Sequence, residues 1–265
     1  MILTNFSDPE FPQSLLDILR QARHVVIFTG AGVSAESGIP TFRDESGGLW
    51  GEYDLDEFAT RAGFKKDPAL VWGWYESRRK QAMRAQPNPA HIAIAHLAQH
   101  VEKLTIITQN IDDLHERAGC VEVMHLHGSF FTPRCFACAR PYNKLLDSPD
   151  VDSSNIRQEP PRCARCNGRI RPGVVWFGEQ LQRDIYRPAQ RAAHSCDVIF
   201  SIGTSSLIYP AAALPFEAAA RGISVVQINP SATDLDAKAS FNLRGRAGDI
   251  MPRLLAVAWP GDRAG

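Results

Sequence analysis

The chain has no excess of charge of either sign, because 29 lysines and arginines balance 29 aspartates and glutamates. A protein whose main partner is nucleic acid or an anionic membrane normally carries a broad basic surface. The charge balance removes that electrostatic footprint and favours partners that are recognised through specific contacts. We therefore expect no nucleic-acid partner.

Long apolar runs are missing as well. No stretch approaches the run of about 18 apolar residues that a membrane-spanning helix needs. The opening residues 1–11, MILTNFSDPEF, lack the basic and apolar regions of a signal peptide. The sequence thus predicts no membrane partner and a cytoplasmic location, where thiols stay reduced.

Cysteine is scarce, and its six copies are unevenly placed. Four of them form two Cys-x-x-Cys pairs, Cys135 with Cys138 and Cys163 with Cys166, separated by 24 residues. Each pair presents two thiolates to one tetrahedral Zn²⁺, and two pairs fill all four positions, leaving none for water or substrate. The pattern predicts one structural zinc ion. Redox pairs or two disulfides are the alternative, but neither pair is followed by a thioredoxin-like helix.

The 265 residues, 44% of them hydrophobic, suffice for one large core or for a large and a small domain. Short runs rich in β-branched residues alternate with helical stretches and end in Gly, Ser, Thr or Asn. This alternation is typical of a parallel sheet with helices on both faces, the Rossmann-like α/β class. Ligands of such sheets bind at the carboxyl ends of the strands. We expect strands within residues 24–30, 103–110, 121–129, 196–206 and 222–231.

A Gly-rich loop follows the first expected strand. Gly30, Ala31, Gly32 and Ala35 fit the pattern G-x-G-x-x-A, in which missing side chains let backbone N–H groups approach a pyrophosphate. In a dehydrogenase this loop opens a long helix, followed by a second strand that ends in an acid. Here residues 37–40, Ser-Gly-Ile-Pro, stop the helix after about one turn, because proline cannot continue it. The loop predicts a bound dinucleotide without implying hydride transfer.

Blocks along nearly the whole chain resemble those of the sirtuin family and occur in the same order. Sirtuins are NAD-consuming protein lysine deacylases. The resemblance therefore implies a Rossmann-type large domain, a small zinc module, and acylated lysine side chains of proteins held between the two. The blocks are GAGVSAESGIPTFR (30–43), TQNIDDLHERAG (108–119), HGS (127–129), the two cysteine pairs, VVWFGE (174–179), GTSS (203–206) and the asparagine at position 229.

The resemblance divides the chain into three parts. Residues 1–45, 91–130 and 177–265 form the expected Rossmann-like, NAD-binding large domain. Residues 46–90 form a helical insertion that carries the acyl pocket. Residues 131–176 form the expected four-cysteine zinc module, the small domain.

The reaction implied by the resemblance begins when the acyl oxygen attacks C1′ of the nicotinamide ribose and nicotinamide leaves. The acyl group then migrates to give O-acyl-ADP-ribose. His127 is the implied general base that takes a proton from the ribose hydroxyls, a task that suits an imidazole with a pKa near neutrality. His125 lies two residues earlier on the same face and serves as the control residue for the role of His127. Asn110 and Asp112 are the implied partners of the nicotinamide carboxamide and its ribose.

The resemblance also implies the residues that bind NAD. Gly203, Thr204 and Ser205 would line the phosphate or ribose side, Asn229 would contact the adenosine ribose, and Arg43 matches the arginine of the cofactor loop. The expected cofactor residues are Gly30, Ala31, Gly32, Ala35, Glu36, Thr41, Phe42, Arg43, Trp50, Gln109, Asn110, Ile111, Asp112, Gly203, Thr204, Ser205, Asn229, Pro230, Ser231 and Ala247.

A helical stretch that Asp67 and Pro68 open, as N-cap and first-turn proline, carries Tyr75 and Arg78 on one face. These two residues match the Tyr-x-x-Arg pair of the sirtuins that remove malonyl, succinyl and glutaryl groups. Ala59 matches the small residue that widens the tunnel in that class. A guanidinium can bind the carboxylate at the end of such an acyl chain through two hydrogen bonds. We therefore expect acidic acyl groups to be accepted besides acetyl.

The substrate backbone is expected to add as a strand along residues 174–179, with residues 206–209 on its other side. Such pairing gives affinity through main-chain hydrogen bonds and little sequence selectivity. The expected substrate contacts are Ala59, Tyr75, Arg78, Val175, Phe177, Gly178, Glu179 and Tyr209.

Two other functions stay open at this point. ADP-ribosyl transfer shares the first step and differs in the nucleophile that captures C1′. The cysteine module could instead be a nucleic-acid-binding zinc ribbon, since residues 134–171 carry eight basic and four acidic side chains. That module offers few aromatic side chains for base stacking, which argues against the second alternative. The sequence identifies neither the protein substrates nor the oligomeric state.

Overall fold

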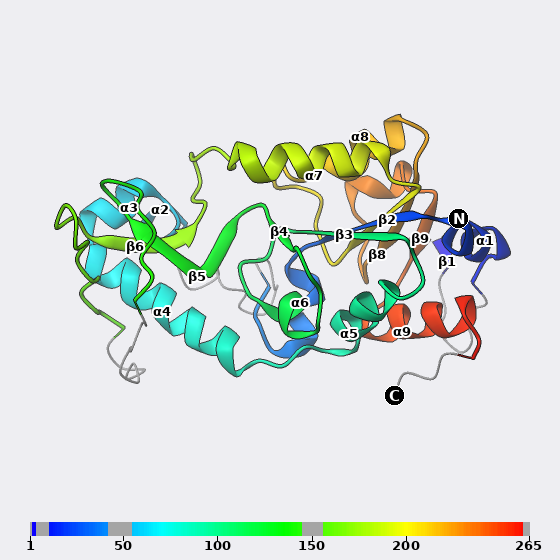
Figure 1. Ribbon diagram of the computed structural model, residues 1–265, viewed down its shortest axis with the longest axis horizontal. Coiled ribbons are helices and arrows are strands. Elements are labelled where there is room, and N and C mark those ends of the chain that lie inside the picture. Colours follow the sequence, from blue (N-terminus) through cyan, green and yellow to red (C-terminus); the bar gives the residue numbers. More distant parts are fainter. Residues whose placement is uncertain (1, 4–10, 42–54, 145–155, 262–265) are drawn as a thin grey trace.

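The computed structural model describes residues 2–3, 11–41, 55–144 and 156–261. Within these ranges, seven strands form one parallel sheet in the order β1-β9-β8-β7-β2-β3-β4 (Figure 1). The strands are β1 (Ile2–Leu3), β2 (His24–Thr29), β3 (Lys103–Thr108), β4 (Met124–His125), β7 (Val198–Ile202), β8 (Ser224–Ile228) and β9 (Phe241–Leu243). The parallel sheet predicted from alternating strands and helices is confirmed.

Helices cover both faces of this sheet because its strands are apolar on both sides. In β2, Val25 and Ile27 join one core cluster, and Val26 and Phe28 join another, as the alternation of side chains along a strand requires. The first cluster includes side chains of α1 (Gln13–Gln21), α5 (Pro89–Leu97) and α9 (Ala247–Ala258), and the second includes those of α7 (Arg183–Ser195) and α8 (Ala213–Ala220). The Rossmann-like α/β class is thus confirmed.

A second, smaller group of elements surrounds an antiparallel strand pair. This pair consists of β5 (Gly128–Cys135) and β6 (Ile170–Val174). Phe64, Trp72 and Trp176 belong to the core cluster of this group. Figure 1 shows the group on the left and the parallel sheet on the right, with α6 (Leu114–Arg117) between them. The helices of the group are α2 (Leu55–Phe58), α3 (Arg61–Lys66) and α4 (Pro68–Arg84).

Helix α4 begins where the sequence predicts. The Asp67 side chain accepts a hydrogen bond from Leu70 N at 3.1 Å, and Pro68 occupies the first turn. Arg157 also donates two hydrogen bonds to the Asp67 carboxylate, at 2.7 and 2.9 Å. The N-cap therefore starts the helix and fixes it to the segment that precedes the second cysteine pair. No helix in the described ranges is long and apolar enough to cross a membrane.

The chain leaves the parallel sheet earlier than the sequence predicts. Of the strand expected over residues 121–129, only Met124 and His125 pair with β3. Gly128 has a φ of +76°, in the left-handed region that favours glycine, and there the chain turns into β5 of the other sheet. His127 therefore lies in the crossing between the two sheets and not within a long central strand.

Candidate active site at the carboxyl edge of the sheet

The loops after β2 and β7 meet where the strand order reverses. β3 lies on one side of β2 and β7 on the other, and open α/β sheets bind ligands at such a switch point. Gly30 N donates to Ile202 O at 3.0 Å, and Gly32 N donates to Gly203 O at 2.8 Å. The two loops are therefore bound to each other through their backbones.

The glycines are needed for this contact between loops. A Cβ on Gly32 would lie 2.7 Å from the Gly203 carbonyl oxygen, and a Cβ on Gly30 would lie 2.8 Å from the Thr204 Cβ. The Gly32 N–H, which the sequence pattern assigns to a pyrophosphate, already donates to Gly203. The pattern thus marks a loop at the switch point of the sheet, and the structure gives its glycines a packing role.

Two short 3₁₀ helices, Ala31–Val33 and Ala35–Ser37, follow, and Gly38 ends them with a φ of +80°. The helix stops early, as the sequence predicts. Glu36 accepts a hydrogen bond from Gly248 N at 2.8 Å, at the start of α9. This carboxylate, which the resemblance assigns to the cofactor, thus complements the positive end of a helix.

Polar side chains from neighbouring strands converge on Thr204. Gln109, after β3, donates to Thr204 Oγ1 at 3.0 Å, and Asn229, after β8, donates to the Thr204 carbonyl oxygen at 2.8 Å.

Phe42, Arg43 and Trp50 lie outside the described residues. Of the other expected cofactor residues, Ala35, Ser205, Pro230 and Ser231 are exposed, Ala31, Thr41 and Ile111 are half-buried, and Ala247 is buried.

A buried polar network fixes the loop after β3. Ser34 Oγ donates to the Asp112 carboxylate at 3.1 Å and accepts from the Asn110 amide at 3.1 Å. His91 Nε2 lies 3.5 Å from the same hydroxyl. Burial raises the pKa of Asp112 and lowers the pKa of His91 to about 4, so that His91 is neutral at pH 7. Ser34 and His91, to which the sequence assigned no role, thus hold Asn110 and Asp112 together.

His127 has the tautomer that a general base at Nε2 requires. Its Nδ1 lies 3.0 Å from the Gln109 carbonyl oxygen. Since a carbonyl only accepts, Nδ1 carries the proton and Nε2 of the neutral ring keeps its lone pair. Burial lowers the pKa of His127 from its ordinary value, which keeps the ring neutral at pH 7. The residue can therefore take up a proton at Nε2.

The pKa of His125 is shifted in the opposite direction from that of His127. Its Nδ1 lies 2.9 Å from the Asn110 carbonyl oxygen, and its Nε2 lies 2.7 Å from the Glu116 carboxylate. Both partners accept, so both ring nitrogens donate and the ring is charged. Burial opposes that charge, but the hydrogen bonds to Glu116 and to the Asn110 carbonyl outweigh it and raise the pKa of His125. This residue anchors the loop and has no free nitrogen to act as a base.

The segment that follows β6 forms backbone hydrogen bonds with two other parts of the chain. Val175 N donates to the His127 carbonyl oxygen at 2.8 Å, and Phe177 N donates to the carbonyl oxygen of the buried Ala59 at 2.9 Å. These two N–H groups, which the sequence offers to a substrate strand, are therefore engaged within the protein. Phe177 and Gly178 are exposed, so a peptide lying along this segment would use its other backbone groups.

Glu179 takes part in a partly buried ion pair. Its carboxylate accepts from both terminal nitrogens of Arg171, at 2.6 and 2.9 Å, and from Trp176 N at 3.0 Å. Burial alone would raise the pKa of Glu179, but the hydrogen bonds from Arg171 and Trp176 lower it to about 2. The structure thus gives Glu179 an internal partner, whereas Tyr209, another expected substrate contact, is 64% exposed.

Tyr75 and Arg78 project from the same side of α4. Tyr75 is buried, and its hydroxyl oxygen accepts a hydrogen bond from Trp176 Nε1 at 3.1 Å. Arg78 is half-buried, donates to Gln81 at 3.0 Å, and places its guanidinium 5.5 Å from the centre of the Trp74 ring. A phenol and a guanidinium are thus presented together within aromatic surroundings.

The four paired cysteines come together beside β5 and β6. Their sulfur atoms all lie within 4.8 Å of one another, with Cys135 and Cys166 at 3.5 Å and Cys138 and Cys163 at 3.8 Å. Neither distance is that of a disulfide bond. Four thiolates bound to zinc at about 2.3 Å have separations of this size around a tetrahedral ion. Backbone N–H groups of Cys166 and Arg165 lower the pKa of Cys163, whereas hydrogen bonds with the neighbouring thiols raise the pKa of Cys166. The four residues fit one structural zinc ion, as predicted.

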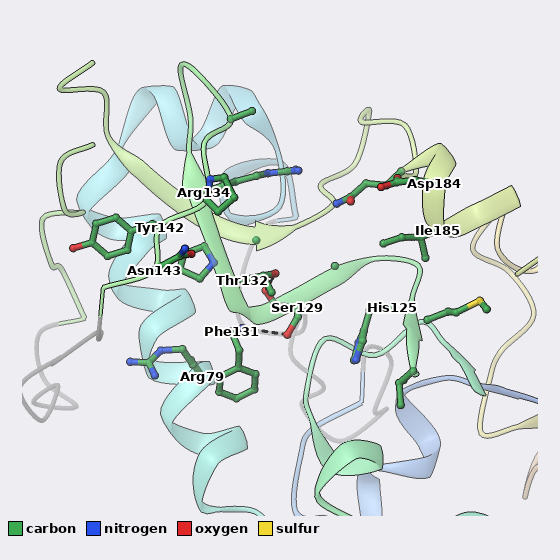
Figure 2. A pocket seen from close by; sticks show the side chains of 18 of the residues that line it. Arg79, His125, Ser129, Phe131, Thr132, Arg134, Tyr142, Asn143, Asp184 and Ile185 are labelled. Carbon is green, nitrogen blue, oxygen red and sulfur yellow. Dashed lines mark hydrogen bonds between the residues drawn. The ribbon is translucent and has the colours of Figure 1, made fainter. Parts of the chain in front are cut away.

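A hollow of about 950 Å³ opens along β5, between α4 and the start of α7. Figure 2 shows Arg79 and Phe131 on one side of it, and Asp184 and Ile185 on the other. His125, Gly128 and Ser129 line this hollow, the last two from the HGS block, whereas His127 is not among its lining residues. The hollow therefore adjoins the crossing that carries His127.

Fold and site together define a Rossmann-type α/β protein with a nucleotide-binding edge, a neutral histidine at the crossing between sheets, and an inserted four-cysteine module. The chain belongs to the Sir2 family, because the model of that family matches residues 30–210. This confirms the resemblance to sirtuins that the sequence motifs carry.

Similar proteins cover nearly the whole chain. An NAD-dependent protein deacylase of Methylococcus capsulatus is 57% identical over 246 residues, which are 93% of this chain and 96% of that protein. NAD-dependent protein deacylase 1 of Pseudomonas aeruginosa is 51% identical over 249 residues, 94% of this chain and 100% of that protein. A solved Sir2 homologue in complex with NAD has a TM-score of 0.84 and 43% identity, and the match covers 94% of each chain.

Zinc is expected to stabilise the protein without taking part in the chemistry. Metal analysis should find one zinc ion per chain, and a strong chelator should lower the melting temperature because four thiolates lose their common partner. Cys163→Ala should have the same effect. Cys196→Ala, which removes a buried cysteine outside the pairs, is the matched control and should keep its zinc. A Cys163→Ala protein with full zinc content and unchanged melting temperature would contradict the assignment.

The two neighbouring histidines are expected to titrate on opposite sides of the ordinary value of 6.5. His127 should titrate below it, because burial disfavours the charged ring, and His125 should titrate above it, because Glu116 stabilises the charged ring. Nitrogen-15 NMR of labelled histidine, assigned with His125→Asn and His127→Asn, measures both. The reverse order of the two pKa values would show that the assigned protonation states are wrong.

Proposed function

We propose that the protein is an NAD-dependent protein deacylase that removes acyl groups from lysine side chains and releases nicotinamide and O-acyl-ADP-ribose. The observation that carries this proposal is the hydrogen bond from His127 Nδ1 to the Gln109 carbonyl, which leaves Nε2 as a base next to the loop of Asn110 and Asp112. Membership of the Sir2 family and the names of similar proteins support the same reaction.

NAD is the co-substrate, and it supplies the electrophilic carbon C1′ of its nicotinamide ribose. We propose that its adenosine end lies near Asn229 and Ala247, and that Asn110 and Asp112 hold its nicotinamide end. The polar edge supports this placement, since Asn229 and Thr204 are joined there by a hydrogen bond. The small residues of the Gly-rich loop leave this edge accessible to a ligand.

Each side chain near the reacting end has a separate task in this proposal. His127 Nε2 accepts a proton from a ribose hydroxyl, and the Gln109 carbonyl stabilises the charged ring that results. Ser34 binds one N–H of the Asn110 amide, so that the amide is oriented before the nicotinamide carboxamide arrives. The buried Asp112 is fixed by the same hydroxyl and faces the ribose.

The acyl groups that we propose include malonyl, succinyl and glutaryl besides acetyl. Tyr75 and Arg78 supply a hydroxyl and a cation on one side of α4, and Ala59 is small and buried. A carboxylate brought into these aromatic surroundings needs an opposite charge to offset its lost hydration. Arg78 provides that charge, and its planar guanidinium can bind both carboxylate oxygens.

Acylated proteins are the proposed substrates, bound through their backbone along residues 174–179. Main-chain contacts of this kind discriminate little between sequences. We place the protein in the cytoplasm, because zinc-bound thiolates are stable in a reducing compartment.

The substitution His127→Tyr is expected to abolish deacylation of an acetyl peptide, with a loss of at least about a hundredfold, because the general base is removed. Mass spectrometry of a reaction with NAD follows both the peptide and O-acyl-ADP-ribose. His125→Asn is the matched control and should act mainly by lowering the melting temperature. An active His127→Tyr enzyme would show that the base is wrongly assigned. A protein that gains the mass of ADP-ribose, without O-acyl-ADP-ribose, would identify ADP-ribosyl transfer instead.

The substitution Arg78→Met is expected to lower kcat/KM for a succinyl peptide by about a hundredfold, because the charge-assisted hydrogen bonds to the carboxylate are lost. Activity on the acetyl form of the same peptide should fall far less. Arg84→Met removes an exposed cation from the last turn of the same helix and is the matched control. Steady-state kinetics with both peptides measures the effect, and an equal loss on both would rule out the proposed contact with the carboxylate.

A further inference from the structure

The hydroxyl of Tyr75 is an acceptor in the one hydrogen bond that it forms within the described part of the chain. Trp176 Nε1 lies 3.1 Å from the Tyr75 oxygen, and an indole nitrogen can only donate. The phenolic proton must therefore point away from the indole. It stays available as a donor.

Aromatic rings surround the Tyr75 side chain. The centre of the Tyr75 ring lies 4.8 Å from that of Trp74, 6.3 Å from that of Phe130 and 6.4 Å from that of Trp176. Tyr75 is 5% exposed, so bulk water has little access to it. Among the described residues, no acceptor forms a hydrogen bond with the proton. A buried donor without an acceptor is costly, so the site favours a ligand that brings an oxygen.

Trp176 is fixed in the orientation that makes this contact. Its backbone N donates to Glu179 at 3.0 Å, and the Arg171 guanidinium lies 3.4 Å from the centre of its ring. Its ring also packs against Phe64, with 5.4 Å between the ring centres, and the residue is 2% exposed. The direction of the Tyr75 hydroxyl is therefore set before any ligand binds, which reduces the entropy lost on binding.

We propose that Trp176 is a positioning residue that sets acyl specificity, because its N–H makes Tyr75 a donor toward the end of the acyl chain. This inference rests on the proposed acceptance of acidic acyl groups. A terminal carboxylate accepts the phenolic proton in a charge-assisted hydrogen bond, whereas the methyl end of an acetyl group has no acceptor. Without the indole N–H, the hydroxyl turns freely and loses its preference for the carboxylate.

The test measures kcat/KM of the wild type and of Trp176→Phe with one peptide that carries either succinyl-lysine or acetyl-lysine. The succinyl-to-acetyl ratio should fall about tenfold in Trp176→Phe, as expected for one weakened charge-assisted hydrogen bond, mainly through a higher KM for the succinyl peptide. The same substitution in a Tyr75→Phe background is the matched control. There the ratio should change by less than about twofold, because the hydroxyl is already absent.

A second variant separates the lost donor from lost packing. Benzothienylalanine at position 176 replaces the indole N–H with sulfur and keeps the size of the ring system. It should lower the ratio as Trp176→Phe does, with a melting temperature close to that of the wild type. If Trp176→Phe folds poorly, the benzothienylalanine variant is measured in its place.

Three outcomes would overturn the inference. An equal loss on both peptides, or an equal fall in the ratio with and without the Tyr75 hydroxyl, would show that Trp176 acts through packing alone. A wild-type enzyme that uses the succinyl peptide, but whose ratio is unchanged in both position-176 variants, would refute the inference and leave the acyl proposal intact. A wild-type enzyme that deacetylates but does not use the succinyl peptide would refute both.

Discussion

The site depends on the backbone contact between the loops after β2 and β7. Gly32 N donates to Gly203 O, and a Cβ on either glycine would collide with the backbone of the other loop. The spacing of the two loops is therefore set by their main chains and not by adaptable side chains. Thr204 is carried by one loop and Ser34 by the other, and Ser34 binds Asp112. One contact at the switch point thus positions both the polar edge and the buried network.

The loop after β3 is held by two histidines of opposite character. His127 and His125 donate to the consecutive carbonyls of Gln109 and Asn110. The hydrogen bond to the Glu116 carboxylate raises the pKa of the second ring, whereas burial lowers the pKa of the first, which has no such carboxylate partner among the described residues. A charged ring is a strong anchor and cannot accept a proton, and a neutral ring can. The difference between the anchoring ring and the ring proposed as base therefore follows from one carboxylate and not from the histidines themselves.

Local patterns in the sequence predicted the parallel α/β class, the cysteine pairs, the early stop of the helix near Gly38 and the start of α4. They failed over residues 121–129, where a short run rich in apolar residues suggested one strand but Gly128 turns the chain into another sheet. β1 and β9 contain two and three residues, too few for a periodic pattern. The motifs placed Asn110 and Asp112 correctly in one loop. The contacts that hold them join distant parts of the chain, which no spacing rule reports.

A series of contacts connects β6, beside the four cysteines, to Tyr75. Arg171 in β6 pairs with Glu179, which accepts from Trp176 N, and the Trp176 indole donates to Tyr75. Arg171 is 1% exposed, so it cannot exchange its partner for water without leaving a charge unpaired. A shift of β6 would therefore disturb Glu179 and, with it, the indole that donates to the Tyr75 hydroxyl. A zinc ion held by the four cysteines would therefore act on the proposed acyl specificity through this series of contacts, without contacting the substrate.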